Sequence, residues 1–134
     1  MRLTAFTDLG LRAMMRLAGD PSRTFTTDDI ATEFAISRHH LAKIVRDLSR
    51  AGYVATRRGA AGGVRLARPA EAITLGDIVR TLEAGEALAE CFRNDGGACV
   101  LTPRCQLKKR LAVAREAFLC SLDATTLAEC AYHA

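Results

Sequence analysis

The segment 37–68 constrains the fold most, because it specifies a helix with one buried face followed directly by a hairpin. Apolar residues recur at helical spacing over 37–51 and predict a face turned toward a core: Leu41, Ile44, Val45 and Leu48. Ser37 is expected to cap the start of this helix, and Ala51-Gly52 to end it. Two short β-prone runs at 53–57 and 64–67 flank a glycine-rich tip, so they predict a two-stranded hairpin.

Two further helices are predicted upstream of this segment. The first covers 9–18, with Thr7 or Asp8 as its cap. A short second helix follows, with Thr26 or Thr27 as its cap. Helix, tight turn, second helix and hairpin, in this order, is the layout of a winged helix-turn-helix. We therefore expect a mainly α fold in which 1–70 form a winged helix-turn-helix DNA-binding region with a two-stranded β wing.

Positive charge is concentrated on the second helix and the hairpin. Residues 37–68 carry eight Lys/Arg and one acid, a net charge of +7, whereas 71–134 carry a net charge of −2. Such a concentration predicts a polyanionic partner, and an exposed helix fits the DNA major groove. We therefore expect double-stranded DNA to be contacted by Ser37, Arg38, His39, His40 and Lys43 of the helix and by Arg57, Arg58, Gly62, Gly63 and Arg65 of the wing. Arg68 is expected to add a phosphate or minor-groove contact. A solvated arginine-rich surface and a protein-binding winged helix are the alternatives.

The second half of the chain, 71–134, is predicted to hold a dimerisation helix. A helix is expected over 70–84, capped by Thr74, and the longest helix over 106–122. Apolar residues repeat every three or four positions in the longest helix: Leu107, Leu111, Ala114, Phe118 and Leu122. Leu119 widens this stripe. Helix-turn-helix proteins usually address two half-sites with two copies, so we expect this stripe to pair two chains in a homodimer. Cys120 is expected at an interior position of this helix, and a short tail helix over 124–131.

Three cysteines lie on one loop between these two helices. Cys91, Cys99 and Cys105 are separated by seven and five residues. Thiolates on one glycine-containing loop can reach one metal centre without long-range closure, and they suit zinc or an iron–sulfur cluster. The spacing lacks the two-residue gap of zinc knuckles, which disfavours zinc. A fourth ligand would come from elsewhere, and ordinary unligated thiols are the alternative.

Other classes of protein fit the sequence less well. The chain has no Ser/His/Asp arrangement, no phosphate loop after a strand and no CxxC pair, so an enzyme is not expected. Its apolar runs are too short for a membrane span and it lacks a signal-peptide core, so we expect a cytoplasmic protein without a membrane partner. An iron–sulfur redox carrier and a protein-interaction module are the alternatives that need no DNA.

Four stretches of the sequence resemble one known family. They are Leu3-Thr4-x-Phe6-Thr7-Asp8-x-Gly10-Leu11-Arg12-Ala13, Ile36-Ser37-Arg38-x-His40-Leu41-x-Lys43-Ile44-Val45, Leu48-Ser49-Arg50-Ala51-Gly52-Tyr53-Val54 and Arg58-Gly59-x-x-Gly62-Gly63-Val64-Arg65-Leu66. They resemble the dimeric winged-helix iron–sulfur regulators, whose members include NsrR, IscR and RirA, and the resemblance covers nearly the whole chain. The stretch Cys99-x-Leu101-Thr102-Pro103-x-Cys105-x-Leu107-Lys108 is most similar to the nitric-oxide-sensing, NsrR-like members.

The resemblance implies a function and a set of ligands. Cys91, Cys99 and Cys105 would hold a cluster, 4Fe-4S or alternatively 2Fe-2S, and Asp8 of the partner subunit would be the fourth ligand. The chain would be a homodimeric repressor that leaves operator DNA when nitric oxide reacts with the cluster. IscR-like members carry a His shortly after the third Cys, where this chain has Leu107 and Lys108. The first cysteine gap is long and contains Asn94-Asp95-Gly96-Gly97, and Ala89-Glu90-Cys91-Phe92 is similar to iron-responsive, RirA-like members, so an iron or cluster-status signal is the alternative.

Overall fold

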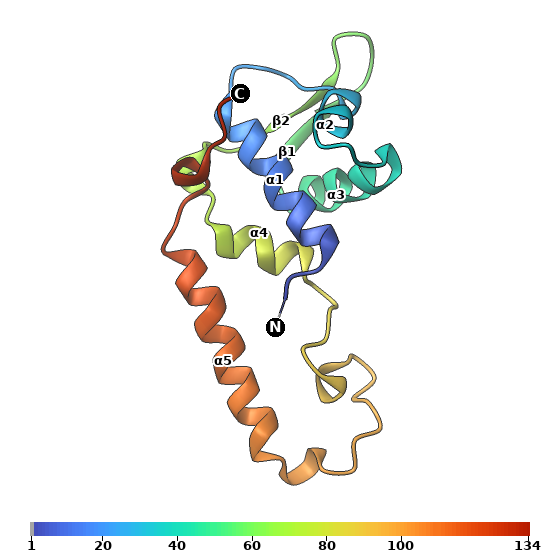
Figure 1. Cartoon of the computed structure of the whole chain (residues 1–134), viewed down its shortest axis with the longest axis vertical. Coiled ribbons are helices and arrows are strands. Elements are labelled where there is room, and N and C mark those ends of the chain that lie inside the picture. Colours follow the sequence, from blue (N-terminus) through green and yellow to red (C-terminus); the bar gives the residue numbers. More distant parts are fainter. Residues whose placement is uncertain (1) are drawn as a thin grey trace.

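The computed structural model describes residues 2–134, and its first part is a winged helix-turn-helix (Figure 1). Helix α1 (Ala5–Gly19) and helix α2 (Thr27–Glu33) both pack against α3 (Arg38–Arg50). Strand β1 (Val54–Arg57) pairs antiparallel with β2 (Gly63–Leu66) to form the wing. The mainly α fold with a two-stranded wing is thereby confirmed, and both strands lie within one residue of their predicted bounds.

Side-chain caps start these helices. Thr26 caps α2 by accepting from the Asp29 N–H at 3.0 Å, and Ser37 caps α3 by accepting from the His40 N–H at 3.2 Å. The prediction for α1 is wrong by one turn, because Thr4 accepts from the Thr7 N–H at 3.2 Å and is the cap. Thr7 is instead a fully buried residue inside the helix.

Two helices predicted for the second half are shorter than expected. Instead of one helix over 70–84, a 3-10 turn at Ala70–Ala72 precedes α4 (Leu75–Leu82), because extended backbone at Ile73 separates them and Thr74 starts α4 with a capping box. The tail helix over 124–131 is also wrong, since only a 3-10 turn forms at Leu127–Cys130. There the Leu127 N–H donates to the Ile73 carbonyl at 2.7 Å, so backbone pairing with a distant segment replaces continued helix.

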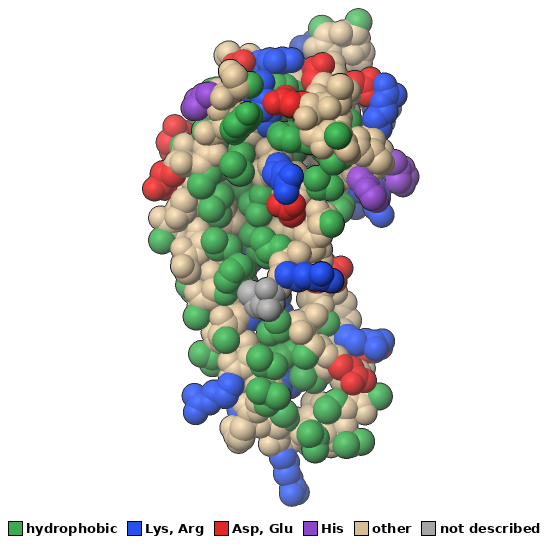
Figure 2. Space-filling view, viewed as in Figure 1, with side chains coloured by type: hydrophobic (Ala, Val, Ile, Leu, Met, Phe, Trp, Pro, Cys, Tyr) green, Lys and Arg blue, Asp and Glu red, His purple; other side chains and the backbone are tan. Residues whose placement is uncertain are grey.

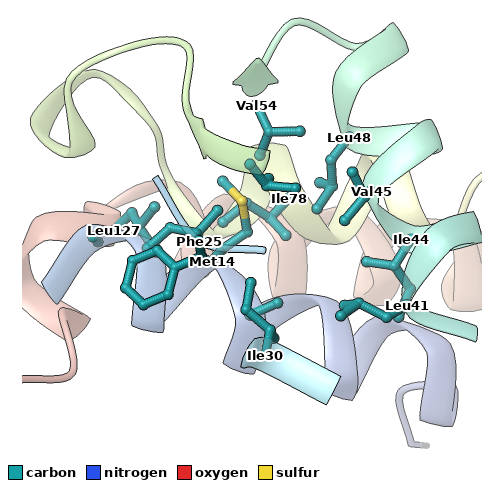
Figure 3. Packing of buried hydrophobic residues seen from close by; sticks show 14 of the residues in the cluster. Met14, Phe25, Ile30, Leu41, Ile44, Val45, Leu48, Val54, Ile78 and Leu127 are labelled. Carbon is teal, nitrogen blue, oxygen red and sulfur yellow. The ribbon is translucent and has the colours of Figure 1, made fainter. Parts of the chain in front are cut away.

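One hydrophobic core joins all of these elements (Figure 3). Met14 of α1 and Phe25 before α2 lie at its centre, both fully buried. The predicted inner face of α3 contributes as expected, with Leu41, Ile44, Val45 and Leu48 all buried. Ile78 of α4 and Leu127 of the tail belong to the same cluster, so the winged helix and part of the second half share one core.

Helix α5 (Gln106–Asp123) leaves this core and extends away from it, with the cysteine loop at its far end (Figure 1). Leu119 is its one buried residue, while Leu107 and Val113 are 65% and 66% exposed. Cys120 is exposed, which contradicts the interior position expected for it, because α5 packs against α4 around Leu119 and Cys120 lies outside that contact. Among residues 2–134, no helix has the length and apolar character needed to cross a membrane.

Candidate nucleic-acid interface and cysteine loop

The start of α3 presents the side chains predicted to read DNA. Burial of the opposite helix face turns Arg38, His39, His40 and Lys43 outward, and all four are exposed together with the cap Ser37. Histidine and basic side chains gather at the α3 edge of the molecule (Figure 2). An exposed, positively charged first turn has the placement from which a helix-turn-helix contacts base edges.

One acidic residue shapes this surface and was not singled out from the sequence. Asp28, in the first turn of α2, accepts a hydrogen bond from the Arg38 guanidinium at the first turn of α3. Neighbouring Asp29 has a different role, because it accepts from the Thr26 N–H at 2.9 Å and completes the capping box. Those contacts and nearby Arg23 hold the pKa of Asp29 below its ordinary value. Two adjacent acids therefore serve different purposes.

The wing carries exposed arginines around a tightly closed tip. Arg57, Arg58 and Arg65 are exposed. The two glycines predicted to approach DNA also have structural roles. A Cβ on Gly62 would lie 2.1 Å from the Arg57 carbonyl oxygen, and one on Gly63 would lie 2.3 Å from the Phe25 carbonyl oxygen. Since real atoms cannot approach so closely, these glycines let the hairpin close and pair with the segment before α2.

Arg68 lies at the base of the wing and not at its tip. Its guanidinium stacks over Tyr53 at 4.8 Å and donates to the Ala51 carbonyl at 3.4 Å. That carbonyl is at the C-terminal end of α3, where a cation is favourable. Arg68 therefore links the end of α3 to the returning strand and positions the wing.

The cysteine loop holds three free, half-buried thiols. Cys91 lies in a 3-10 turn (Glu90–Phe92), Cys99 lies further along the loop, and Cys105 caps α5 by accepting from the Lys108 N–H at 3.4 Å. Within residues 2–134, no three His, Cys, Asp or Glu side chains lie close enough together to hold a metal ion. The structure therefore does not bring the three predicted ligands together.

Two contacts nevertheless fold the loop back on itself. Glu90 accepts from the Ala98 N–H at 2.9 Å, which brings the chain around Cys91 next to the chain around Cys99. The Lys108 ammonium lies 5.8 Å from the centre of the Phe92 ring, which links the start of α5 to the same turn. Three unpaired thiols on one folded loop have the donor chemistry that an iron–sulfur cluster requires.

Asp8, the predicted fourth ligand, lies on the exposed side of α1. Its carboxylate is paired with Arg12 one turn later, with a contact of 2.7 Å. Within residues 2–134, Asp8 belongs to no group of three side chains that could hold a metal ion. A role toward a partner subunit would require this exposed pair to open.

The start of α1 is bonded to the end of α4. Thr4 donates to the Glu83 carboxylate through its N–H and its hydroxyl, both at 2.9 Å. Burial raises the pKa of Glu83, but hydrogen bonds from Thr7 and Thr4 and nearby Arg115 outweigh it and hold that pKa below its ordinary value. The helix that carries Asp8 is thereby fixed to the helix that leads into the cysteine loop.

An ion pair between a buried arginine and a partly exposed glutamate ties α1 to the helix-turn-helix. The Arg16 Nε donates to both oxygens of Glu33 at the end of α2, at 2.9 and 3.1 Å. The Arg16 side chain is only 8% exposed, and its guanidinium also covers the Phe25 ring at 4.7 Å. The sequence did not single out either residue, because the two partners lie on different helices.

The basic winged helix, the cysteine loop and the partly exposed long helix together define a winged-helix transcriptional regulator. The chain belongs to the Rrf2 family of iron-dependent transcriptional regulators, which residues 3–133 match. It is 49% identical to the HTH-type transcriptional regulator NsrR of Geobacillus kaustophilus (strain HTA426) over 131 residues, or 96% of this chain and 88% of that protein. The family is one of transcriptional regulators, which agrees with the expectation that the chain is not an enzyme.

Solved structures of the same family have this fold. Oxidized CymR of Staphylococcus aureus matches with a TM-score of 0.74 at 31% identity, covering 100% of this chain and 98% of that one. T. potens IscR matches with a TM-score of 0.72 at 27% identity, covering 96% and 84%. These matches confirm the fold class over essentially the whole chain.

Proposed function

We propose that the chain is a homodimeric repressor that binds operator DNA through α3 and the wing and holds an iron–sulfur cluster on the cysteine loop. Nitric oxide is the proposed signal, and loss of DNA binding is the proposed response. The observation that carries the proposal is the combination of an exposed basic reading face with three free thiols on one folded loop. Similarity to a regulator named NsrR supports nitric oxide over other signals.

The DNA-binding part predicts distinct roles for helix and wing. Arg38, His39, His40 and Lys43 would contact base edges, whereas Arg58 and Arg65 would neutralise phosphates. Replacing both wing arginines with alanine removes four cations from the proposed dimer, so it should weaken binding about equally for all sequences and make the salt slope shallower by roughly three to four. Fluorescence anisotropy at several salt concentrations measures both quantities. Unchanged affinity and salt slope would exclude the wing from the interface.

The cysteines supply the proposed cluster ligands. Cys91, Cys99 and Cys105 would hold the cluster, which supplies an iron site that reacts with nitric oxide. Cys99→Ala should abolish cluster retention after anaerobic purification. Cys120→Ala is the matched control, because Cys120 is an exposed thiol on α5 outside the loop. Iron and sulfide content retained in the Cys99 variant would refute the ligand assignment.

Exposed apolar side chains on α5 support the homodimer. Leu107, which belongs to the predicted stripe, and Val113, which lies outside it, would be covered by the partner, since large exposed apolar side chains often mark interfaces. The carboxylate of Asp8 of the partner subunit would serve as fourth ligand once its pair with Arg12 opens. Sedimentation equilibrium of a Val113→Asp variant should show a shift toward monomer. An unchanged dimer would place the interface elsewhere.

An iron-responsive regulator is the second candidate. The family description as iron-dependent and the long loop between Cys91 and Cys99 favour it. Native mass spectrometry of anaerobically purified protein, before and after nitric oxide, separates the two. A dimer whose 4Fe-4S mass changes at low nitric oxide stoichiometry supports the nitric oxide sensor. A cluster that resists nitric oxide but is lost on iron chelation supports the iron sensor.

A further inference from the structure

Asp28 stands out because it is an acid beside a surface proposed to bind a polyanion. It lies in the first turn of α2 and is 53% exposed at its side chain, next to a basic α3. A carboxylate at such a place repels phosphates, so by charge alone it would weaken DNA binding. Its presence therefore needs a compensating role.

The hydrogen bonds of Asp28 point to one partner. Within residues 2–134, Arg38 is the residue that its carboxylate contacts, whereas Asp29 beside it is occupied by the capping box. The Arg38 guanidinium in turn uses one terminal nitrogen for Asp28 and makes no other hydrogen bond in the described part of the chain. A guanidinium has five N–H donors in a fixed plane, so most of its donors remain free.

Packing does not hold Arg38 in place. Asp28 and Arg38 line a hollow of about 330 Å³ between α2 and α3, together with Ala31, Thr32 and Ile36. The Arg38 side chain is 73% exposed. Because no wall of side chains confines the guanidinium, its ion pair with Asp28 is what restricts its orientation.

We propose that Asp28 is a positioning residue for sequence recognition, which holds one edge of the Arg38 guanidinium so that its free donors face a single position of the operator. The inference rests on the proposed DNA-binding function. A long, flexible arginine without this support contacts any phosphate or base within reach, whereas a held arginine loses less freedom when it binds one target. Specificity is a difference between two affinities, so Asp28 raises the ratio of operator to random binding even though its charge lowers both.

The test measures that ratio with the cluster-loaded protein. The operator is the duplex that the wild type selects from a random DNA pool, and the competitor is a scrambled duplex of equal length. Asp28→Asn should bind the scrambled duplex more tightly while the ratio of operator to scrambled affinity falls threefold or more. Glu71→Gln is the matched control, because it removes the same charge from an exposed acid with no ion pair in the described chain, and it should leave the ratio unchanged.

A double mutant tests whether Asp28 acts through Arg38. Arg38→Ala alone should lower the ratio, and adding Asp28→Asn to it should lower the ratio no further. The positioning role would be overturned if Asp28→Asn raised the affinity for both duplexes equally. It would also be overturned if the effects of the two substitutions on the affinity ratio were additive in the double mutant. A wild type that selects no duplex from the pool would refute the proposed DNA-binding function itself, which is a different result from either of these.

Discussion

Gly10 lies where α1 crosses α4 and α3, and its replacement by alanine sets two opposing effects against each other. Alanine in place of glycine stabilises a helix interior by about 1 kcal/mol. A Cβ at this position, however, would lie 2.2 Å from Leu82 Cδ1 and 3.3 Å from Ile44 Cγ2, and both of these side chains are buried. Forcing an extra methyl group into a packed core costs about 1–3 kcal/mol. We expect the packing cost to win, with a net loss of about 1 kcal/mol.

Thermal and urea unfolding at one fixed protein concentration test this balance, because the proposed dimerisation would make stability depend on concentration. The Tm of Gly10→Ala should fall by about 4 °C. Leu82→Val removes the atom that clashes, so the double variant should be more stable than the sum of the single changes predicts. A Gly10→Ala protein as stable as the wild type, or strictly additive effects, would show that the helices do not cross so closely.

Three further predictions follow from the contacts described above. Glu83→Gln should lower the free energy of unfolding at pH 7, and this difference from the wild type should shrink below pH 4.5. The pKa of the Glu83 carboxyl is lower in the folded protein than its ordinary value of 4.5, so the carboxylate stabilises the fold above pH 4.5 and loses that contribution as the pH falls through the folded pKa. A difference in stability that stays constant with pH would contradict this. Glu33→Gln should cost about 2 kcal/mol in urea unfolding, since it leaves the buried Arg16 cation without its carboxylate, and a loss below about 0.5 kcal/mol would place that cation in water. Arg68→Ala should leave the salt slope of DNA binding nearly unchanged while lowering the free energy of unfolding by about 1 kcal/mol. A change in salt slope as large as that of Arg58→Ala would show instead that Arg68 contacts a phosphate.

Local patterns in the sequence were sufficient to predict the order of helices and strands in the winged helix-turn-helix. The period of Leu41, Ile44, Val45 and Leu48 predicted which face of α3 is buried, and that burial turned Arg38 toward solvent as expected. Caps such as Ser37 were also predicted, because a cap bonds to a backbone N–H only a few residues away. The cysteine spacing predicted a metal centre, and resemblance to a family added the cluster type and Asp8 as fourth ligand; all of these ligands stay a prediction.

Signals that depend on distant partners were missed. The break before α4 follows from backbone pairing with the tail, and Cys120 is exposed because it lies outside the contact between α5 and α4. The sequence also did not predict which acidic residue pairs with which basic residue, since the partners of Arg16 and Arg38 lie on other helices.

The sequence by itself therefore determined the winged helix-turn-helix, its basic face and the loop on which the thiols lie, because periodicity, caps and turns act over a few residues. Only the tertiary structure decided how these parts are coupled. Arg16 joins α1 to α2, Glu83 joins α4 to the start of α1, and Asp28 holds Arg38, each across a distance in sequence that no local pattern spans. The physical reason is that an ion pair or a buried contact depends on where the packed core places two helices, and that placement is a property of the whole chain.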